Sequence, residues 1–218
     1  MADNRYRSES FSWLATAYHE AGHAVVILLL GRTLLWVELT SHSTGAAWRE
    51  SIEARLAQLA DEASRRGRMP PELLRLWREE FWISDAGAIA EAEFNLVPDD
   101  ALVNGALGDE LRKFSLIPDE DRHAFVRDYF HRHLGRWCDL IKEDCRQFFR
   151  LRHVSAMTRT LAEALLRTRR MDGEEVIDTL LANRATLTGQ MDLFWVPIGD
   201  NPFAHRRNHP PPKQMRLL

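Results

Sequence analysis

Three residues near the N-terminus, His19, Glu20 and His23, form the pattern with the clearest chemical meaning in this sequence. They lie in an apolar segment with helical periodicity, and residues four apart share one face of a helix, about one turn apart. His19 and His23 can therefore each aim a ring nitrogen at one zinc ion, at the required distance of about 2.0–2.1 Å. Glu20 can reach a water at that ion without being a ligand. The arrangement is typical of zinc hydrolases, in which the glutamate is the general base.

The surroundings of this pattern favour a metal site over the alternative of two solvated histidines on a helix surface. Residues 24–30 are all aliphatic, which predicts a buried helix, and histidines on a buried helix need polar partners. Gly22 is a poor helix former, about 1 kcal/mol worse than Ala. A glycine here indicates that another element approaches the helix closely.

A catalytic zinc site needs a third protein ligand, and the usual nearby position does not supply it. The sixth residue after His23 is Leu29, so the ligand must come from farther along the chain. Asp109, in the glycine-rich segment 104–111, is the best candidate for the third metal ligand, and Glu110 is the second candidate.

The helix that carries the histidines is expected to begin near Ser12 and to stop at Gly31, a typical C-terminal signal. Residues 33–40 are rich in strand formers, and residues 46–48 follow a turn as a short return strand. A substrate peptide could add to the edge of this small sheet through its backbone, at Gly45, Ala46 and Ala47. The alternative is a structural ribbon that covers the helix.

The rest of the chain is predicted to be helical, so the fold class is mainly α with a small β-hairpin or short sheet after the first helix. Residues 84–94 form a helix of small residues, capped by Ser84 or Asp85, that can approach Gly22 closely. On it, Glu91 and Glu93 are candidate partners that orient a ligand histidine. For Glu93, a solvated charge on the helix surface is at least as good an explanation. The other expected helices span residues 49–68, 72–81, 119–130, 134–150 and 153–170, and a capping box at 172–175 begins the last one.

Composition points to a soluble, cytoplasmic protein. The 218 residues are 45% hydrophobic and 28% charged, with a net charge of −3, which gives no electrostatic case for nucleic acid or an acidic membrane surface. The longest apolar run, residues 24–30, is much shorter than the roughly 20 residues that span a bilayer. Cys138 and Cys145 lack the spacing of a zinc-ligand pair and are expected to be reduced thiols.

Several segments resemble the peptidase domain of the FtsH-type ATP-dependent zinc metalloproteases. Residues 17–26 resemble that family's zinc motif, and residues 86–91, 105–109, 161–166 and 171–175 resemble further stretches in the same order. The resemblance implies a helical zinc peptidase domain over residues 12–188, with Asp109 as the third ligand. An alignment shifted by one residue would place Glu110 there instead. Residues 49–82 are longer and more charged than the family pattern, which implies a helical insertion. Outside this domain, we expect residues 1–11 to be a loose N-terminal arm and residues 189–218 to be a Pro-rich extended tail.

The family's ATPase module and membrane anchor have no counterpart in this sequence, so we expect a peptidase domain that stands alone. The leading hypothesis is a zinc-dependent metalloendopeptidase, ATP-independent on its own, that hydrolyses peptides or unfolded protein segments. The alternative is a peptidase-like domain with weak or no activity that binds peptides or proteins. A separate ATPase or a homo-oligomer is left open as a partner, whereas nucleic acid and membranes are not expected.

Overall fold

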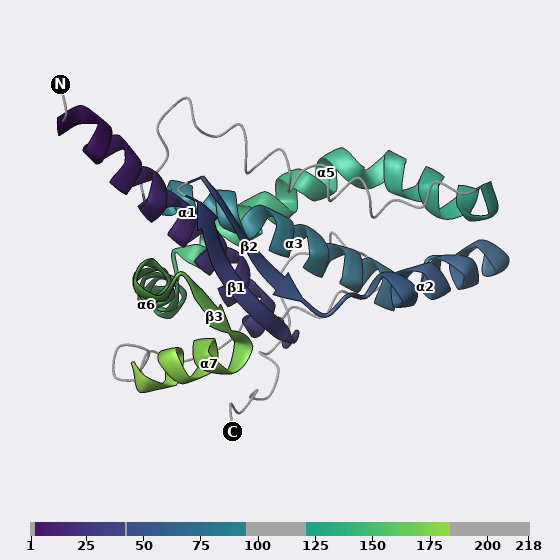
Figure 1. Cartoon of the computed structure of the whole chain (residues 1–218). Helices are drawn as coiled ribbons and strands as arrows, with labels where there is room; N and C mark the ends of the chain where they lie inside the picture. The colour runs from purple at the N-terminus through teal and green to yellow at the C-terminus, as the bar shows by residue number, and fades with distance from the viewer. Residues whose placement is uncertain (1–2, 42, 95–120, 184–218) are drawn as a thin grey trace.

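The protein is mainly helical with a small three-stranded sheet, which confirms the predicted fold class (Figure 1). The computed structural model describes residues 3–41, 43–94 and 121–183. In chain order the elements are α1 (Asp3–Leu29), β1 (Leu34–Ser41), β2 (Thr44–Arg49), α2 (Glu53–Arg66), α3 (Pro71–Glu93), η1 (Asp121–His123), α5 (Ala124–Phe149), α6 (Arg152–Thr168), β3 (Arg170–Asp172) and α7 (Gly173–Ala182).

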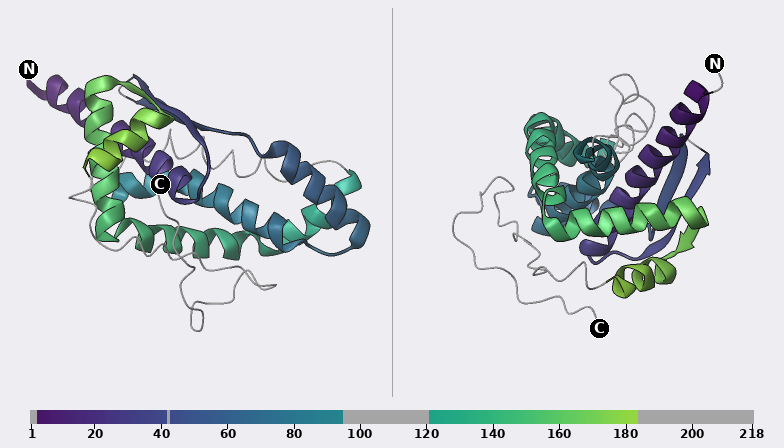
Figure 2. Two further views of the ribbon diagram at one scale, coloured as in Figure 1. Left: turned by 90° about the horizontal axis from the view of Figure 1, so that it is seen from below. Right: turned by 90° about the vertical axis from the view of Figure 1, so that its left-hand side faces the viewer.

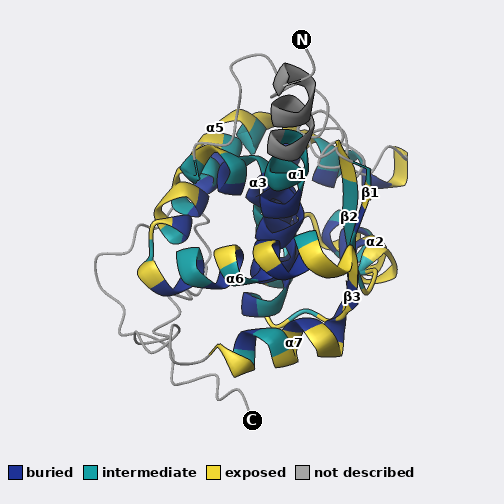
Figure 3. Ribbon diagram, turned by 60° about the vertical axis from the view of Figure 1, so that its left-hand side comes forward, coloured by how far each residue is buried: buried dark blue, intermediate teal, exposed yellow. Residues whose placement is uncertain are grey.

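Helix α1 is the centre of the fold, and the sheet, α3 and α6 pack around it (Figure 3). Ala24, Val25, Val26 and Ile27 are 0% exposed, as the aliphatic run of residues 24–30 predicts. The helix stops where expected, because Gly31 adopts a left-handed φ of 70° that favours glycine.

The start of α1 differs from the expectation. The helix begins at Asp3 and not at Ser12, so the backbone of residues 3–11 is helical where we expected a loose arm. Residues 3–11 contain neither glycine nor proline, so nothing in this segment interrupts the helix before Ser12. The serine that resembles an N-cap is an interior residue, and its carbonyl accepts a hydrogen bond from the Thr16 hydroxyl at 3.0 Å.

The small sheet lies against α1 in the strand order β2-β1-β3. The predicted hairpin is confirmed, with Val37 of β1 opposite Ala47 of β2, and the third strand pairs Val37 with Met171. Strand β3 was not predicted, because we expected a helix to run through Arg170. Instead α6 ends at Thr168, and Arg169 takes a left-handed φ of 66°. The order places β2 at an edge of the sheet.

Two pairs of predicted helices are each one continuous helix. Residues 72–81 and 84–94 were expected to be separate, but α3 runs from Pro71 to Glu93. Ser84 and Asp85, which resemble helix caps, are buried inside this helix at 3% and 6% exposure. Likewise α5 covers residues 124–149, where we expected two helices with a break after residue 130. In both cases the intervening residues contain no proline, and packing along the whole length overrides the local signals.

Helices α2, α3 and α5 form a layer that extends away from the sheet, with α3 and α5 side by side and α2 at their far end (Figure 2). A separate apolar cluster that includes Trp77, Phe81, Phe130 and Trp137 holds these helices together. A buried ion pair between Glu80 of α3 and Arg49 at the end of β2 joins this layer to the sheet. Residues 53–66 and 71–82 are helical, as expected, but the helix predicted from residue 49 begins at Glu53, because Arg49 is the last residue of β2.

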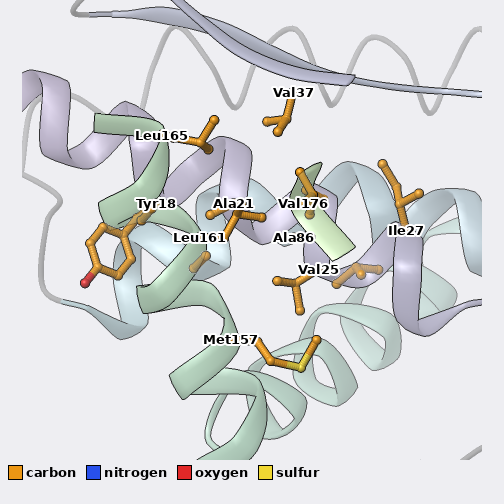
Figure 4. Close-up of a cluster of buried hydrophobic side chains, with 14 of the residues drawn as sticks. Tyr18, Ala21, Val25, Ile27, Val37, Ala86, Met157, Leu161, Leu165 and Val176 are labelled. Atoms are coloured by element: carbon orange, nitrogen blue, oxygen red, sulfur yellow. The ribbon is translucent and has the colours of Figure 1, made fainter. Parts of the chain in front are cut away.

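Helices α6 and α7 cover the apolar core that surrounds α1. Side chains from α1, β1, α3, α6 and α7 meet in this core, among them Val25, Val37, Leu161 and Val176 (Figure 4). The predicted capping box at the start of α7 is confirmed: the Asp172 side chain accepts from the Glu175 amide and the Glu175 carboxylate accepts from the Asp172 amide, each at 2.9 Å. No helix in the described residues combines the length and apolar character needed to cross a membrane.

Candidate metal centre

His19 and His23 are brought together by one turn of α1, in the buried centre of the protein. Their side chains point to the same side of the helix, and the two Nε2 atoms lie 3.0 Å apart. The residues are 8% and 7% exposed. Two nitrogens bound at the usual length to one tetrahedral zinc ion are about 3.3 Å apart. The pair therefore fits two ligands of a single ion with a shift of a few tenths of an ångström.

The opposite nitrogen of each imidazole is held by an oxygen of α3. His19 Nδ1 is hydrogen-bonded to the Glu91 carboxylate, and His23 Nδ1 lies 2.6 Å from the carbonyl oxygen of Ile83. Carboxylate and carbonyl oxygens only accept, so each Nδ1 carries the hydrogen and donates it. In a neutral ring the lone pair is then on Nε2. With both rings neutral, two lone pairs would face each other at 3.0 Å and repel, and a cation between them would remove this repulsion.

Glu20 lies beside the histidine pair and against the edge strand. It is 5% exposed, and a Cβ atom added at Gly45 of β2 would lie 2.6 Å from its Cγ and 2.9 Å from its Oε1. The missing side chain at Gly45 thus leaves room for the carboxylate. The predicted general base and the first of the three predicted substrate-strand residues are in direct contact. Ala46 and Ala47 continue the same edge strand, opposite Glu38 and Val37 of β1.

The two glutamates at the end of α3 have different surroundings. Glu91 contacts His19, whereas Glu93 forms an ion pair with Arg150 of the chain turn after α5, with 3.0 Å between Nη2 and Oε1. Of these two candidates, only Glu91 is placed to orient a ligand histidine by contact with its ring. Solvent reaches the Glu93 pair through its partner, because the Arg150 side chain is 62% exposed, whereas Glu93 and Glu91 are both 20% exposed.

The third ligand stays a prediction, because Asp109 and Glu110 lie outside the described residues, as does the proposed tail. Within residues 3–41, 43–94 and 121–183, no group of three or more His, Cys, Asp or Glu side chains is placed to hold a metal ion. The described part of the chain therefore brings two imidazoles together but places no third ligand side chain beside them.

Two contacts at this site were not predicted. The carbonyl of Ile83 is a backbone group, and no side-chain pattern identifies which carbonyl a histidine will meet. Gly87 packs directly against both Nε2 atoms. Its only signal in the sequence is its place in a run of small residues, which we expected to approach Gly22. That approach is confirmed, since a Cβ at Gly22 would lie 2.7 Å from the carbonyl oxygen of Ala86.

Comparison with known proteins supports a metallopeptidase domain. Residues 3–60, about a quarter of the chain, match the family model described as Peptidase M50B-like. The matched region contains α1 with its two histidines, the β1–β2 hairpin and the start of α2. The match does not support the FtsH-type family specifically. A search of curated proteins finds no match to the chain.

Proposed function

We propose that this chain is a zinc-dependent metalloendopeptidase that hydrolyses peptide bonds without ATP. The observation that carries the proposal is the convergence of the two Nε2 atoms of His19 and His23, each with its Nδ1 held by an oxygen of α3. A pair of buried imidazoles fixed in this way is preorganised for a cation. The peptidase family match over the same residues supports the same conclusion.

His19 and His23 would hold the zinc ion, and the FtsH-type resemblance nominates Asp109 as the third ligand, with Glu110 as the alternative. A zinc ion bound in this way supplies a Lewis acid that polarises the scissile carbonyl and lowers the pKa of a water to about 7. Glu20 accepts the proton of the attacking water and delivers it to the leaving amine.

The proposed substrate is an extended peptide or an unfolded protein segment that pairs with β2. Among the described residues no strand pairs with the outer side of β2, so a substrate strand would pair with the backbone groups on that side. Gly45, Ala46 and Ala47 have small or no side chains, which leaves space for a second backbone. Because Gly45 contacts Glu20, a peptide on this edge would pass directly beside the general base.

Replacement of Glu20 by Gln tests the proposal. The variant keeps the size of the side chain and leaves both histidines in place, so it should bind zinc as the wild type does. Its rate of cleavage of a quenched fluorescent peptide library and of unfolded casein should fall by about 10²–10⁴-fold, the usual contribution of a general base. Glu50→Gln is the matched control, because Glu50 is an exposed glutamate just after β2 and should tolerate the change.

Two results would contradict the proposal. If Glu20→Gln cleaved as fast as the wild type, Glu20 would not be the base. If the wild type bound zinc but cleaved no peptide in the library, the chain would be a peptide- or protein-binding module built on a peptidase fold.

A further inference from the structure

Three residues of α3, spaced four apart, face the two histidines. Ile83 supplies the carbonyl that holds His23, Glu91 supplies the carboxylate that holds His19, and Gly87 lies between them. This spacing repeats about once per helical turn, so the three positions share one face of α3. A Cβ added at Gly87 would lie 2.4 Å from Nε2 of His19 and 2.5 Å from Nε2 of His23.

The backbone conformation does not explain this glycine. Gly87 is in the interior of α3, and the described glycines with positive φ are Gly31 and Gly67. A glycine inside a helix costs about 1 kcal/mol relative to alanine, so its place here needs another reason. The reason is space: the atoms that a side chain would meet are the ring atoms of the two histidines.

Helix packing alone does not explain it either. At Gly22, the other glycine of this helix pair, the nearest atoms to an added Cβ are the Ala86 backbone and the Ala90 Cβ at 2.7 Å. Gly22 therefore serves the approach of the two helices. At Gly87 the three nearest atoms all belong to the imidazoles of His19 and His23. The two glycines of the α1–α3 contact therefore have different roles: Gly22 lies against the backbone of α3, and Gly87 lies against the two imidazoles of α1.

The imidazoles cannot turn aside to admit a side chain at position 87 without losing their partners. Each Nδ1 is fixed by a hydrogen bond to α3 itself, on either side of Gly87. Rotation of either ring breaks one of these bonds inside a buried site, and an unsatisfied buried polar group costs about 1–3 kcal/mol. A shift of α3 would instead separate both rings from their oxygens.

We propose that Gly87 is a positioning residue for the metal, which keeps the volume beside both Nε2 atoms open. The inference rests on the proposed zinc site but not on catalysis. A side chain at position 87 would move at least one imidazole, and the two Nε2 lone pairs would then no longer point to one position. Alanine at this position is therefore expected to weaken metal binding strongly, although it is the best helix former.

Three glycine-to-alanine variants test this. Gly87→Ala should lower zinc affinity by more than about 100-fold in a competition titration with a chromophoric chelator, because at least one of the two proposed histidine ligands is displaced. Gly22→Ala should lower the thermal midpoint of the metal-free protein but keep most of the zinc affinity. Gly135→Ala is the matched control: no atom lies within 4 Å of an added Cβ there, so zinc affinity should not change. Zinc affinity of Gly87→Ala within about threefold of wild type would overturn the inference.

A second measurement uses the wild type and so does not depend on the folding of a variant. With cobalt(II) in place of zinc, the two Gly87 Hα signals should be among the most strongly shifted and broadened backbone resonances of α3. Signals no more affected than those of Gly135 would overturn the inference. Zinc binding without peptide hydrolysis in the wild type would refute the proposed function but leave this inference standing. A wild type that binds no zinc would refute both.

Discussion

Replacement of Glu91 should weaken zinc binding although this residue is not a proposed ligand. Its carboxylate accepts the hydrogen bond from His19 Nδ1 and so fixes the ring with Nε2 toward His23. It also makes the imidazole a better donor to the metal. The contact is largely shielded from water, with side-chain exposures of 10% for His19 and 20% for Glu91. Screening by solvent should therefore reduce its effect only in part.

The expected magnitude depends on what replaces the carboxylate. Loss of such a supporting partner typically costs 10–100-fold in metal affinity, which is about 1.4–2.7 kcal/mol. Glu91→Gln keeps an oxygen that can accept from Nδ1 and loses only the charge, so we expect a loss of about tenfold. Glu91→Ala removes the acceptor and leaves His19 free to turn, so we expect about 100-fold.

Chelator competition gives the affinities directly, and Glu93→Gln is the matched control. Glu93 is two residues farther along the same helix, but it pairs with Arg150 at the surface. Such exposed pairs contribute about 0–1 kcal/mol to stability and nothing to the site. If Glu91→Ala bound zinc as tightly as Glu93→Gln and the wild type, the hydrogen bond to His19 would not support the metal, and the proposed geometry would be wrong.

Three further predictions follow from the same structure. Gly22→Ala should lower the free energy of unfolding by about 1–2 kcal/mol in urea titrations. The new methyl group meets the backbone carbonyl of Ala86, which cannot rotate away. Equal or higher stability of the variant would contradict the close contact between the two helices. Burial raises the pKa of Glu79 from its usual 4.5, against the opposing effects of Arg75 and Arg32. Since the folded protein then holds this proton more tightly, wild-type stability relative to Glu79→Gln should be greatest below pH 4.5 and fall as pH rises through the raised pKa. A difference that does not change with pH would refute this. Removal of zinc with a chelator should lower the unfolding midpoint, and added zinc should restore it in the wild type but not in His23→Ala.

The elements that sequence alone could predict are those that local signals specify. The aliphatic run after His23 predicts the buried part of α1, and Gly31 ends that helix because the left-handed turn there favours glycine. The capping box of Asp172 and Glu175 predicts the start of α7, because these two side chains accept hydrogen bonds from backbone amides of the first turn. The spacing of His19 and His23 predicts that their rings meet, since four residues make about one helical turn.

Tertiary packing decided the features that local signals missed. Ser84 and Asp85 have the side chains of helix caps, yet both are buried within α3, where contacts with the rest of the protein outweigh the local preference. The Ile83 carbonyl is chosen by how α3 crosses α1, which one sequence does not reveal. Gly87 could be recognised as a close-approach residue, but only the crossing of α1 and α3 shows that it approaches the two Nε2 atoms of the proposed metal site.

The most direct test of the zinc site is X-ray absorption at the zinc edge on the purified chain, with His19→Ala/His23→Ala as the control. We predict one zinc ion per chain with two imidazole nitrogens at about 2.0–2.1 Å and oxygen atoms in the remaining positions. The double variant should lose the metal. Sulfur ligands, a single imidazole, or zinc retained by the double variant would contradict the site described here.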